Sequence, residues 1–304
     1  MTVSSSSAHQ TIARSSQAQD VAAVAGRRKP GRGGHRLVSW LVHGLLIIMV
    51  AGVILPLVWT VSSSLKTNNE MFNGAWSLPS HPVWSNFVTA WNQGVVNYLL
   101  NSVLVTLASV VGVVLVSAWG AYALTRLRVP FAKTLTMLVI GGMMLAPTVA
   151  LIPLFRLLQA INLLDSRWAL VILYVAFRIS FTLFLIRAYM LTLPHDVEEA
   201  AVIDGASHWQ IFWRIILPLC KPVLISAGLL QAIFAWNEFA FALVFINTNS
   251  KMTLPVGLMS MQSRLTTDWP VMFAALVIAA LPMMIAFIAG QRHFIRGLAE
   301  GFGK

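Results

Sequence analysis

A short polar segment carries the residues with the clearest chemistry in this chain: Glu199-Ala200-Ala201-Val202-Ile203-Asp204-Gly205-Ala206. Glu199 offers a carboxylate to a basic partner group, and Gly205 permits a backbone turn with positive φ. The alanines keep one side of the segment small, which allows another surface to approach closely. We therefore expect this segment to dock on a second protein, through Glu199, Ala200, Ala201, Asp204, Gly205 and Ala206.

The first half of the surrounding loop, which we place at about 194–218, is predicted to be a short helix. Asp196 is the expected N-cap, and Glu199 lies three residues later, which is the spacing of a capping box. The helix is expected over Val197–Asp204, and Gly205 is expected to end it in a left-handed conformation. Glu198 lies on a different side of this helix from Glu199, so we expect it to tolerate substitution better.

The second half of the loop predicts another helix, from His208 toward Leu217. Ser207 is its expected N-cap, with Gln210 at the capping-box spacing. Its bulky apolar side chains are expected to pack back on the rest of this chain: Trp209, Phe212 and Trp213.

The composition places this loop in a membrane protein. Hydrophobic residues make up 58% of the chain and charged residues 10%, against about 25% charged in soluble domains. Runs of about 20 apolar residues can cross a bilayer, and they must do so as helices to pair their backbone groups. We predict an all-α polytopic protein with six transmembrane helices: 37–61, 97–125, 134–155, 168–186, 222–246 and 271–290.

The distribution of basic residues predicts the orientation. Of the 21 Lys and Arg, fifteen fall in the two terminal tails and in the loops that follow the second and fourth spans. By the positive-inside rule, both termini and the 194–218 loop are cytoplasmic, while residues 66–96 and 247–269 face outward. Residues 1–36 are expected to be a disordered basic tail, and 37–304 the transmembrane domain. The net charge of +11 is explained by topology and lipid contact and calls for no nucleic acid.

Few polar side chains interrupt the predicted spans. Asn237 and Glu238 lie in the fifth, and Arg178 lies in the fourth. Ionisable groups inside a membrane usually face a bundle interior or a water-filled path, so we assign these three residues to a substrate path. Arg178 is expected either to pair with Glu238 or to contact the substrate, and the pair is favoured. In the third span, Pro147 follows two glycines and predicts a kink or a broken helix.

The loop resembles the cytoplasmic signature of binding-protein-dependent ABC importer permeases, which reads E-A-A, three residues, G, nine residues, I-x-L-P. Glu199-Ala200-Ala201, Gly205, Ile215 and Leu217-Pro218 match every position. Further segments resemble the carbohydrate, maltose-permease-like branch: Ala121–Arg128, Ile152–Phe155, Trp236–Phe239 and Gln291-Arg292. Arg178 and Asn162 depart from the pattern of that family.

The resemblance implies a permease subunit in the bacterial inner membrane. Its implied partners are a second permease subunit, two ATPase subunits and an extracytoplasmic solute-binding protein. ATP and Mg²⁺ would bind to the ATPase, since this chain lacks the G-x-x-x-x-G-K-[ST] loop and is not expected to be an enzyme. No cofactor or metal site is expected in this subunit. An ion-coupled secondary transporter is the alternative, but it would need more intramembrane acids than Glu238.

Overall fold

The computed structural model describes residues 32–74, 76–262 and 267–302. Every regular element within these ranges is a helix, as predicted. The longer helices are α2 (Arg32–Ser64), α5 (Val96–Arg126), α6 (Ala132–Gly142), α7 (Leu151–Ala160), α8 (Arg167–Met190), α12 (Lys221–Trp236) and α15 (Trp269–Phe302). The shorter ones are α3 (Asn68–Asn73), α4 (Ser85–Ala90), η1 (Trp91–Val95), η2 (Pro147–Ala150), α9 (Asp196–Ile203), α10 (His208–Ile211), η3 (Phe212–Ile216), α11 (Leu217–Leu219), α13 (Ala240–Phe245), η4 (Asn249–Lys251) and α14 (Leu254–Ser260).

The chain divides into two compact units, residues 1–58 and residues 59–304. The described part of the first unit belongs to α2, so residues 32–36 of the predicted tail are helical and the rest of the tail lies outside the described residues. All the other helices belong to the second unit.

Four helical stretches within the described residues are long and apolar enough to cross a membrane: Ser39–Ser64, Ser85–Arg126, Arg167–Met190 and Trp269–Gln291. Two bent pairs raise the number to six if each pair is one span. The first pair, Ala132–Gly142 with Pro147–Ala160, bends by 86° and confirms the predicted break at Pro147. The second, His208–Leu219 with Lys221–Trp236, bends by 76°.

The predicted fifth span, 222–246, is wrong in its second half. Helix α12 ends at Trp236, and α13 begins separately at Ala240. The Glu238 carboxylate accepts the backbone N–H groups of Phe241 and Ala242, at 2.8 and 3.1 Å. A carboxylate that caps the start of α13 competes with continuation of α12, and this ends the longer helix.

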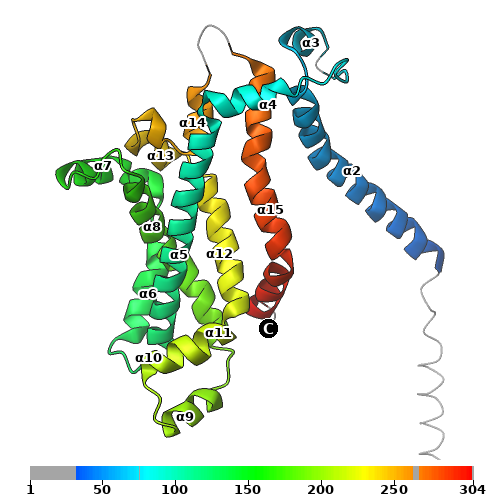
Figure 1. Ribbon diagram of the computed structural model, residues 1–304. Helices are drawn as coiled ribbons and strands as arrows, with labels where there is room; N and C mark the ends of the chain where they lie inside the picture. The colour runs from blue at the N-terminus through cyan, green and yellow to red at the C-terminus, as the bar shows by residue number, and fades with distance from the viewer. Residues whose placement is uncertain (1–31, 75, 263–266, 303–304) are drawn as a thin grey trace, which may run out of the picture. The chain divides into compact units, whose positions relative to one another are not determined.

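Helices α5, α8, α12 and α15 run alongside one another in the second unit (Figure 1). Glycine permits a close approach between α5 and α8. An added methyl group at Gly112 would lie 2.9 Å from Val175, and one at Gly120 would lie 2.8 Å from Leu183. Small residues at a helix interface allow this contact in membranes, where packing rather than hydrophobicity holds helices together.

Polar contacts fasten the end of this bundle that carries α14. Ser102 of α5 accepts the backbone N–H of Leu254 at 2.8 Å. Asp165, just before α8, accepts the N–H groups of Asn247 and Thr248 and forms an ion pair with Lys251 at 2.8 Å. The opposite end carries α9, α10 and α11 (Figure 1).

Candidate coupling site and membrane cavity

Helix α9 spans Asp196–Ile203, close to the predicted 197–204, but it begins without a side-chain cap. Its N-cap is His195, so the predicted capping box between Asp196 and Glu199 is wrong. Asp196, Glu198 and Glu199 all lie in the first turn instead. Carboxylates there are stabilised by the positive end of the helix dipole, which replaces a specific cap.

Gly205 ends α9 as predicted. Its φ is +80°, and its N–H donates to the Val202 carbonyl at 3.0 Å, while Ala206 N–H donates to the Ala201 carbonyl at 3.0 Å. These bonds satisfy carbonyl groups that the last helical turn leaves open. The predicted capping box at the next helix is also confirmed, because Ser207 and Gln210 bond each other in both directions.

The aromatic side of the second helix packs on α5, as expected. The Phe212 ring is buried and lies 4.7 Å from Trp119 and 5.3 Å from Tyr122, between ring centroids. Trp209 meets Trp119 edge-on at 4.8 Å. Tyr122 also donates a long, 3.5 Å hydrogen bond to the His208 carbonyl. The segment His208–Leu219 is thus held against α5 by aromatic contacts.

The predicted docking residues occupy two sides of the loop. Asp196, Glu199, Ala200 and Ile203 follow the i, i+3, i+4, i+7 spacing of one helix face, and all are exposed. Asp204 and Gly205 are exposed beside that face, which we call the outward face of α9. Ala201 and Ala206, by contrast, pack into a core cluster of this chain. Their small size serves the internal contact and not the exposed surface.

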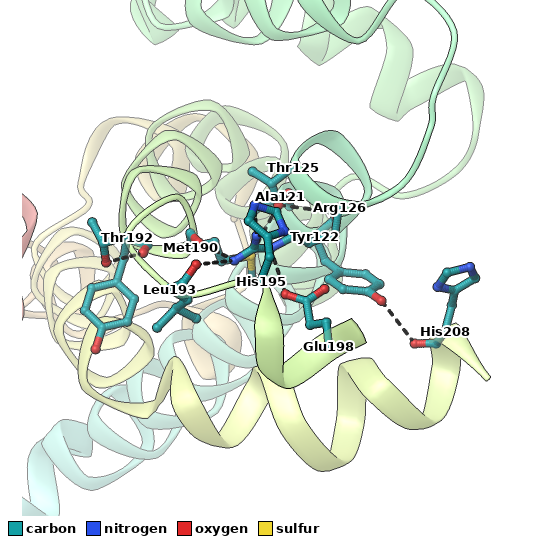
Figure 2. Close-up of polar contacts among 11 residues, drawn as sticks. Ala121, Tyr122, Thr125, Arg126, Met190, Thr192, Leu193, His195, Glu198 and His208 are labelled. Carbon is teal, nitrogen blue, oxygen red and sulfur yellow. Dashed lines mark hydrogen bonds and ion pairs between the residues drawn. The ribbon is translucent and has the colours of Figure 1, made fainter. Parts of the chain in front are cut away.

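Arg126, the last residue of α5, holds the loop in place. Its Nη2 donates to the carbonyl oxygens of Met190 at 2.8 Å and Leu193 at 2.9 Å. Its Nη1 lies 2.6–2.7 Å from the ring nitrogens of His195, and its Nε lies 2.9 Å from Oε1 of Glu198 (Figure 2). Only 2% of the Arg126 side chain is exposed. One guanidinium therefore joins the end of α8, the start of α9 and α5.

Sequence reasoning missed this contact. The basic residues after the second span, Arg126 among them, were used to predict the orientation, and Glu198 was expected to tolerate substitution better than Glu199. In the structure Glu198 points inward, its side chain is 12% exposed, and it is the acidic partner of Arg126. Burial raises the pKa of Glu198, although the nearby Arg126 charge acts to lower it. The available signal was a basic residue directly at the end of an apolar span, where a long side chain can reach the next loop.

The second unit contains a cavity of about 150 Å³ among its helices. Arg178 and Glu238 both line it, together with Tyr174, Phe234 and Thr148. The cavity combines a donor-only guanidinium, a carboxylate and aromatic faces. Such groups can bind a hydroxyl-rich ring by hydrogen bonds and by packing against its C–H faces.

The predicted pair between Arg178 and Glu238 is wrong: the ion pairs of the described residues do not include it. Tyr174 lies one turn before Arg178 on α8, and its hydroxyl donates to Glu238 at 2.6 Å. Arg178 instead lies over the Phe234 ring, 3.9 Å from the ring centroid. Arg178 thus makes a cation–π contact with Phe234 instead of an ion pair with Glu238, although both charged side chains line the same cavity.

Asn237 does not line this cavity. It lines a separate open groove of about 530 Å³, with residues of α14 and α15. Its side-chain amide donates to the Ile233 carbonyl one turn earlier on α12, at 2.8 Å. Asn237 and Glu238 are adjacent in the sequence but face different spaces, because α12 ends at Trp236 and the chain bends at Asn237. Within the described residues, no cluster of three His, Cys, Asp or Glu side chains could hold a metal ion.

Apolar helices around an interior cavity, with a short exposed helix fixed at one end, are the architecture of a membrane transport subunit. The family model of the binding-protein-dependent transport system inner membrane component matches residues 114–300. The chain belongs to this family.

Individual relatives agree with the family. A probable ABC transporter permease protein, YurM of Bacillus subtilis, is 43% identical over 87% of this chain and 87% of its own length. The diacetylchitobiose uptake system permease protein NgcG of Streptomyces coelicolor is 32% identical, covering 88% of this chain and 89% of its own. A chain of a bacterial ABC transporter involved in import of the acidic polysaccharide alginate superimposes with a TM-score of 0.79 at 25% identity, over 88% of this chain and 99% of that one. The protein is therefore a permease subunit of an ABC importer, and the ion-coupled alternative is not favoured.

Proposed function

We propose that this subunit forms one side of a carbohydrate path across a bacterial inner membrane, paired with a second permease subunit. Two ATPase subunits bind ATP and Mg²⁺ and drive the pair, and a solute-binding protein delivers the sugar from outside. The relatives support a carbohydrate, since diacetylchitobiose and alginate are the solutes in their names. The cavity supports it independently, with Arg178, Glu238 and aromatic rings around a space of about 150 Å³.

The outward face of α9 is the observation that carries the coupling role. Glu199 and Ala200 lie on it, Ile203 is 85% exposed, and Gly205 has no atom within 4 Å of where a methyl group would point. An exposed apolar side chain next to a carboxylate and an uncovered glycine is typical of a protein–protein contact surface. The other side of α9 is fixed by Arg126, so this surface is presented rigidly.

Recovery of the ATPase with the tagged permease, measured beside solute uptake, tests the coupling role. Glu199→Lys reverses the exposed charge, and Gly205→Val puts a branched side chain at a left-handed position. Both variants should insert in the membrane but lose ATPase and uptake. Gly141→Ala is the matched control, because that glycine also has nothing within 4 Å but lies in α6. If Gly205→Val keeps both ATPase and uptake, the loop is a passive linker and the proposal fails.

The orientation is tested by labelling from outside intact cells. Cys220 is buried, and its replacement by Ala removes the only native thiol. The two labelling positions are Ser207, at the end of the second unit that carries α9, and Asn73, the last residue of α3. Both residues are exposed, and each is replaced by cysteine in turn. An impermeant reagent should label Asn73→Cys and spare Ser207→Cys. The reverse pattern would place the coupling loop outside and exclude contact with a cytoplasmic ATPase.

A further inference from the structure

One face of α5 holds both halves of the coupling loop. Trp119, Tyr122 and Arg126 follow the i, i+3, i+7 spacing of a single helix face. Trp119 and Tyr122 contact Phe212, in the second half of the loop. Arg126 holds the first half through Glu198 and the turn before α9. The loop is therefore attached to α5 at two places.

The same helix reaches the interior cavity. Ser109 and Val113 of α5 line it, and Gly112 and Gly120 hold α5 in close contact with α8. A rigid helix transmits displacement along its length because its backbone bonds resist bending. A movement of the α5 end at Arg126 would therefore reach the walls of the cavity.

The geometry of the Arg126 contacts indicates that this residue orients α9 relative to α5 rather than adding much to the stability of the fold. A guanidinium is a planar fork with five fixed donors, so partners bound to it keep fixed directions relative to one another. Here the partners are two main-chain carbonyls, His195 and Glu198. Buried ion pairs add little net stability, since desolvation offsets their attraction, and the raised pKa of Glu198 agrees with this.

We infer that Arg126 is the positioning residue through which the coupling helix α9 and α5 move as one body. This inference rests on the proposed function of α9 and adds the route by which its displacement enters the membrane domain. A lysine at 126 would keep the charge but could not hold the carbonyls, His195 and Glu198 at once. The loop would then stay attached through Phe212, while α9 would no longer follow α5.

Distances between two spin labels in the purified complex, with its own ATPase subunits, test whether α9 and α5 move together. Val116→Cys places one label on an exposed position of α5, and Val197→Cys places the other on the flank of α9, beside its outward face. The background carries Cys220→Ala. Distances are measured without nucleotide and with ATP and Mg²⁺ in a hydrolysis-deficient ATPase variant.

With Arg126 present, the distance distribution should be narrow and shift by less than about 2 Å when ATP binds, which is the scale of a small helix shift. In Arg126→Lys and Glu198→Ala the distribution should broaden or shift further. Glu198→Gln, which keeps a polar oxygen beside Arg126, should restore the narrow distribution. Lys133→Met is the control, because it removes an exposed cation at the start of α6, a few residues after Arg126 in the sequence.

Three results would overturn the inference. The first is a distance that changes on ATP binding with Arg126 intact, and the second is an Arg126→Lys distribution identical to that of the parent. A merely structural role for Arg126 would reduce complex yield and melting temperature without widening the distances in the complex that remains, and this too would overturn it. Recovery of the ATPase distinguishes failure of the docking proposal from failure of the Arg126 inference. If Gly205→Val loses the ATPase while Arg126→Lys changes no distance, the docking proposal stands and the Arg126 inference fails.

Discussion

The hydroxyl of Tyr174 on α8 donates a 2.6 Å hydrogen bond to Oε2 of Glu238, at the break between α12 and α13. The same carboxylate accepts two N–H groups of α13. Glu238 therefore has a local structural role as well as a place on the cavity wall. The Tyr174 hydroxyl thus helps to fix the direction of the Glu238 carboxylate on the cavity wall.

Tyr174→Phe should change solute recognition while preserving the fold. The variant removes one hydrogen bond to a charged acceptor, worth about 1.5–3 kcal/mol, but leaves both α13 N–H bonds to Glu238. We expect the KM for uptake to rise several-fold, with expression and ATPase recovery unchanged. An unchanged KM would mean that the position of Glu238 does not matter for the solute.

Asn237→Ala and Arg178→Lys separate the two spaces that could form the path. Arg178 lines the 150 Å³ cavity, and Asn237 lines the groove beside α14 and α15. If the cavity carries the solute, Arg178→Lys should slow uptake and Asn237→Ala should leave it close to normal, because the planar guanidinium on Phe234 has no equivalent in lysine. The opposite result would place the path on the Asn237 side. Initial uptake rates at matched expression decide between them.

Local sequence signals predicted the coupling loop well. Gly205 and the Ser207–Gln210 box depend on residues within a few positions of each other, so propensity and capping rules were sufficient. Asp196 failed as an N-cap because three first-turn carboxylates share the helix dipole, and a specific cap was not needed. The broken third span was likewise local, since the break lies between Gly142 and Pro147, the residues from which it was predicted.

Contacts between distant segments could not be predicted from pattern alone. Nothing in the spacing shows that Arg126 would reach Glu198, or that Tyr174 would take the place expected of Arg178 beside Glu238. The inward position of Ala201 was missed for the same reason, because small residues suit both an exposed cleft and a tight internal contact. Each of these outcomes depends on how α5, α8 and the loop pack in three dimensions.

Glu198→Ala should destabilise the protein, whereas Glu198→Gln should not. Alanine removes the polar group that lies 2.9 Å from the buried Arg126 Nε, and a buried polar atom left without any partner costs about 1–3 kcal/mol. Burial raises the pKa of Glu198 above its ordinary 4.5, so its stabilising contribution is present at low pH and falls as the pH rises through the folded-state pKa. Glutamine is neutral throughout and avoids that loss. Melting temperatures in detergent from pH 5 to 8 test this, with the exposed Glu199→Ala as the control; equal melting of the alanine and glutamine variants would contradict it.

Gly257→Ala should be strongly destabilising, unlike Gly141→Ala. A methyl group at Gly257 would lie 2.3 Å from the Tyr98 ring, which is only 4% exposed. The ring cannot move aside without losing its packing against α14, so overpacking of at least about 1–3 kcal/mol is expected. At Gly141 nothing lies within 4 Å, and alanine favours the helix. The melting temperature of Gly257→Ala should therefore fall, while that of Gly141→Ala should rise or stay unchanged. Similar decreases in both variants would show that the Tyr98 ring moves aside to accommodate the methyl group.

The Asp165 contacts should survive mild acid. Partial burial acts to raise the pKa of Asp165, but hydrogen bonds from Lys251, the Thr248 hydroxyl and the amides of Thr248 and Asn247 outweigh it and hold the pKa well below the ordinary 3.8. A depressed folded-state pKa gives stability that is present above the ordinary pKa and is lost only as the pH falls through the lower folded value. Hydrogen exchange of residues 247–251, corrected for the intrinsic pH effect, should show constant protection from pH 7 to about 4.5. In Asp165→Asn the protection should be lower at every pH and should not vary with it. A loss of protection in the parent chain between pH 6 and 4.5 would instead mean that Asp165 titrates near or above its ordinary value, and that the bonds to Lys251 and Thr248 do not hold the carboxylate in its charged form.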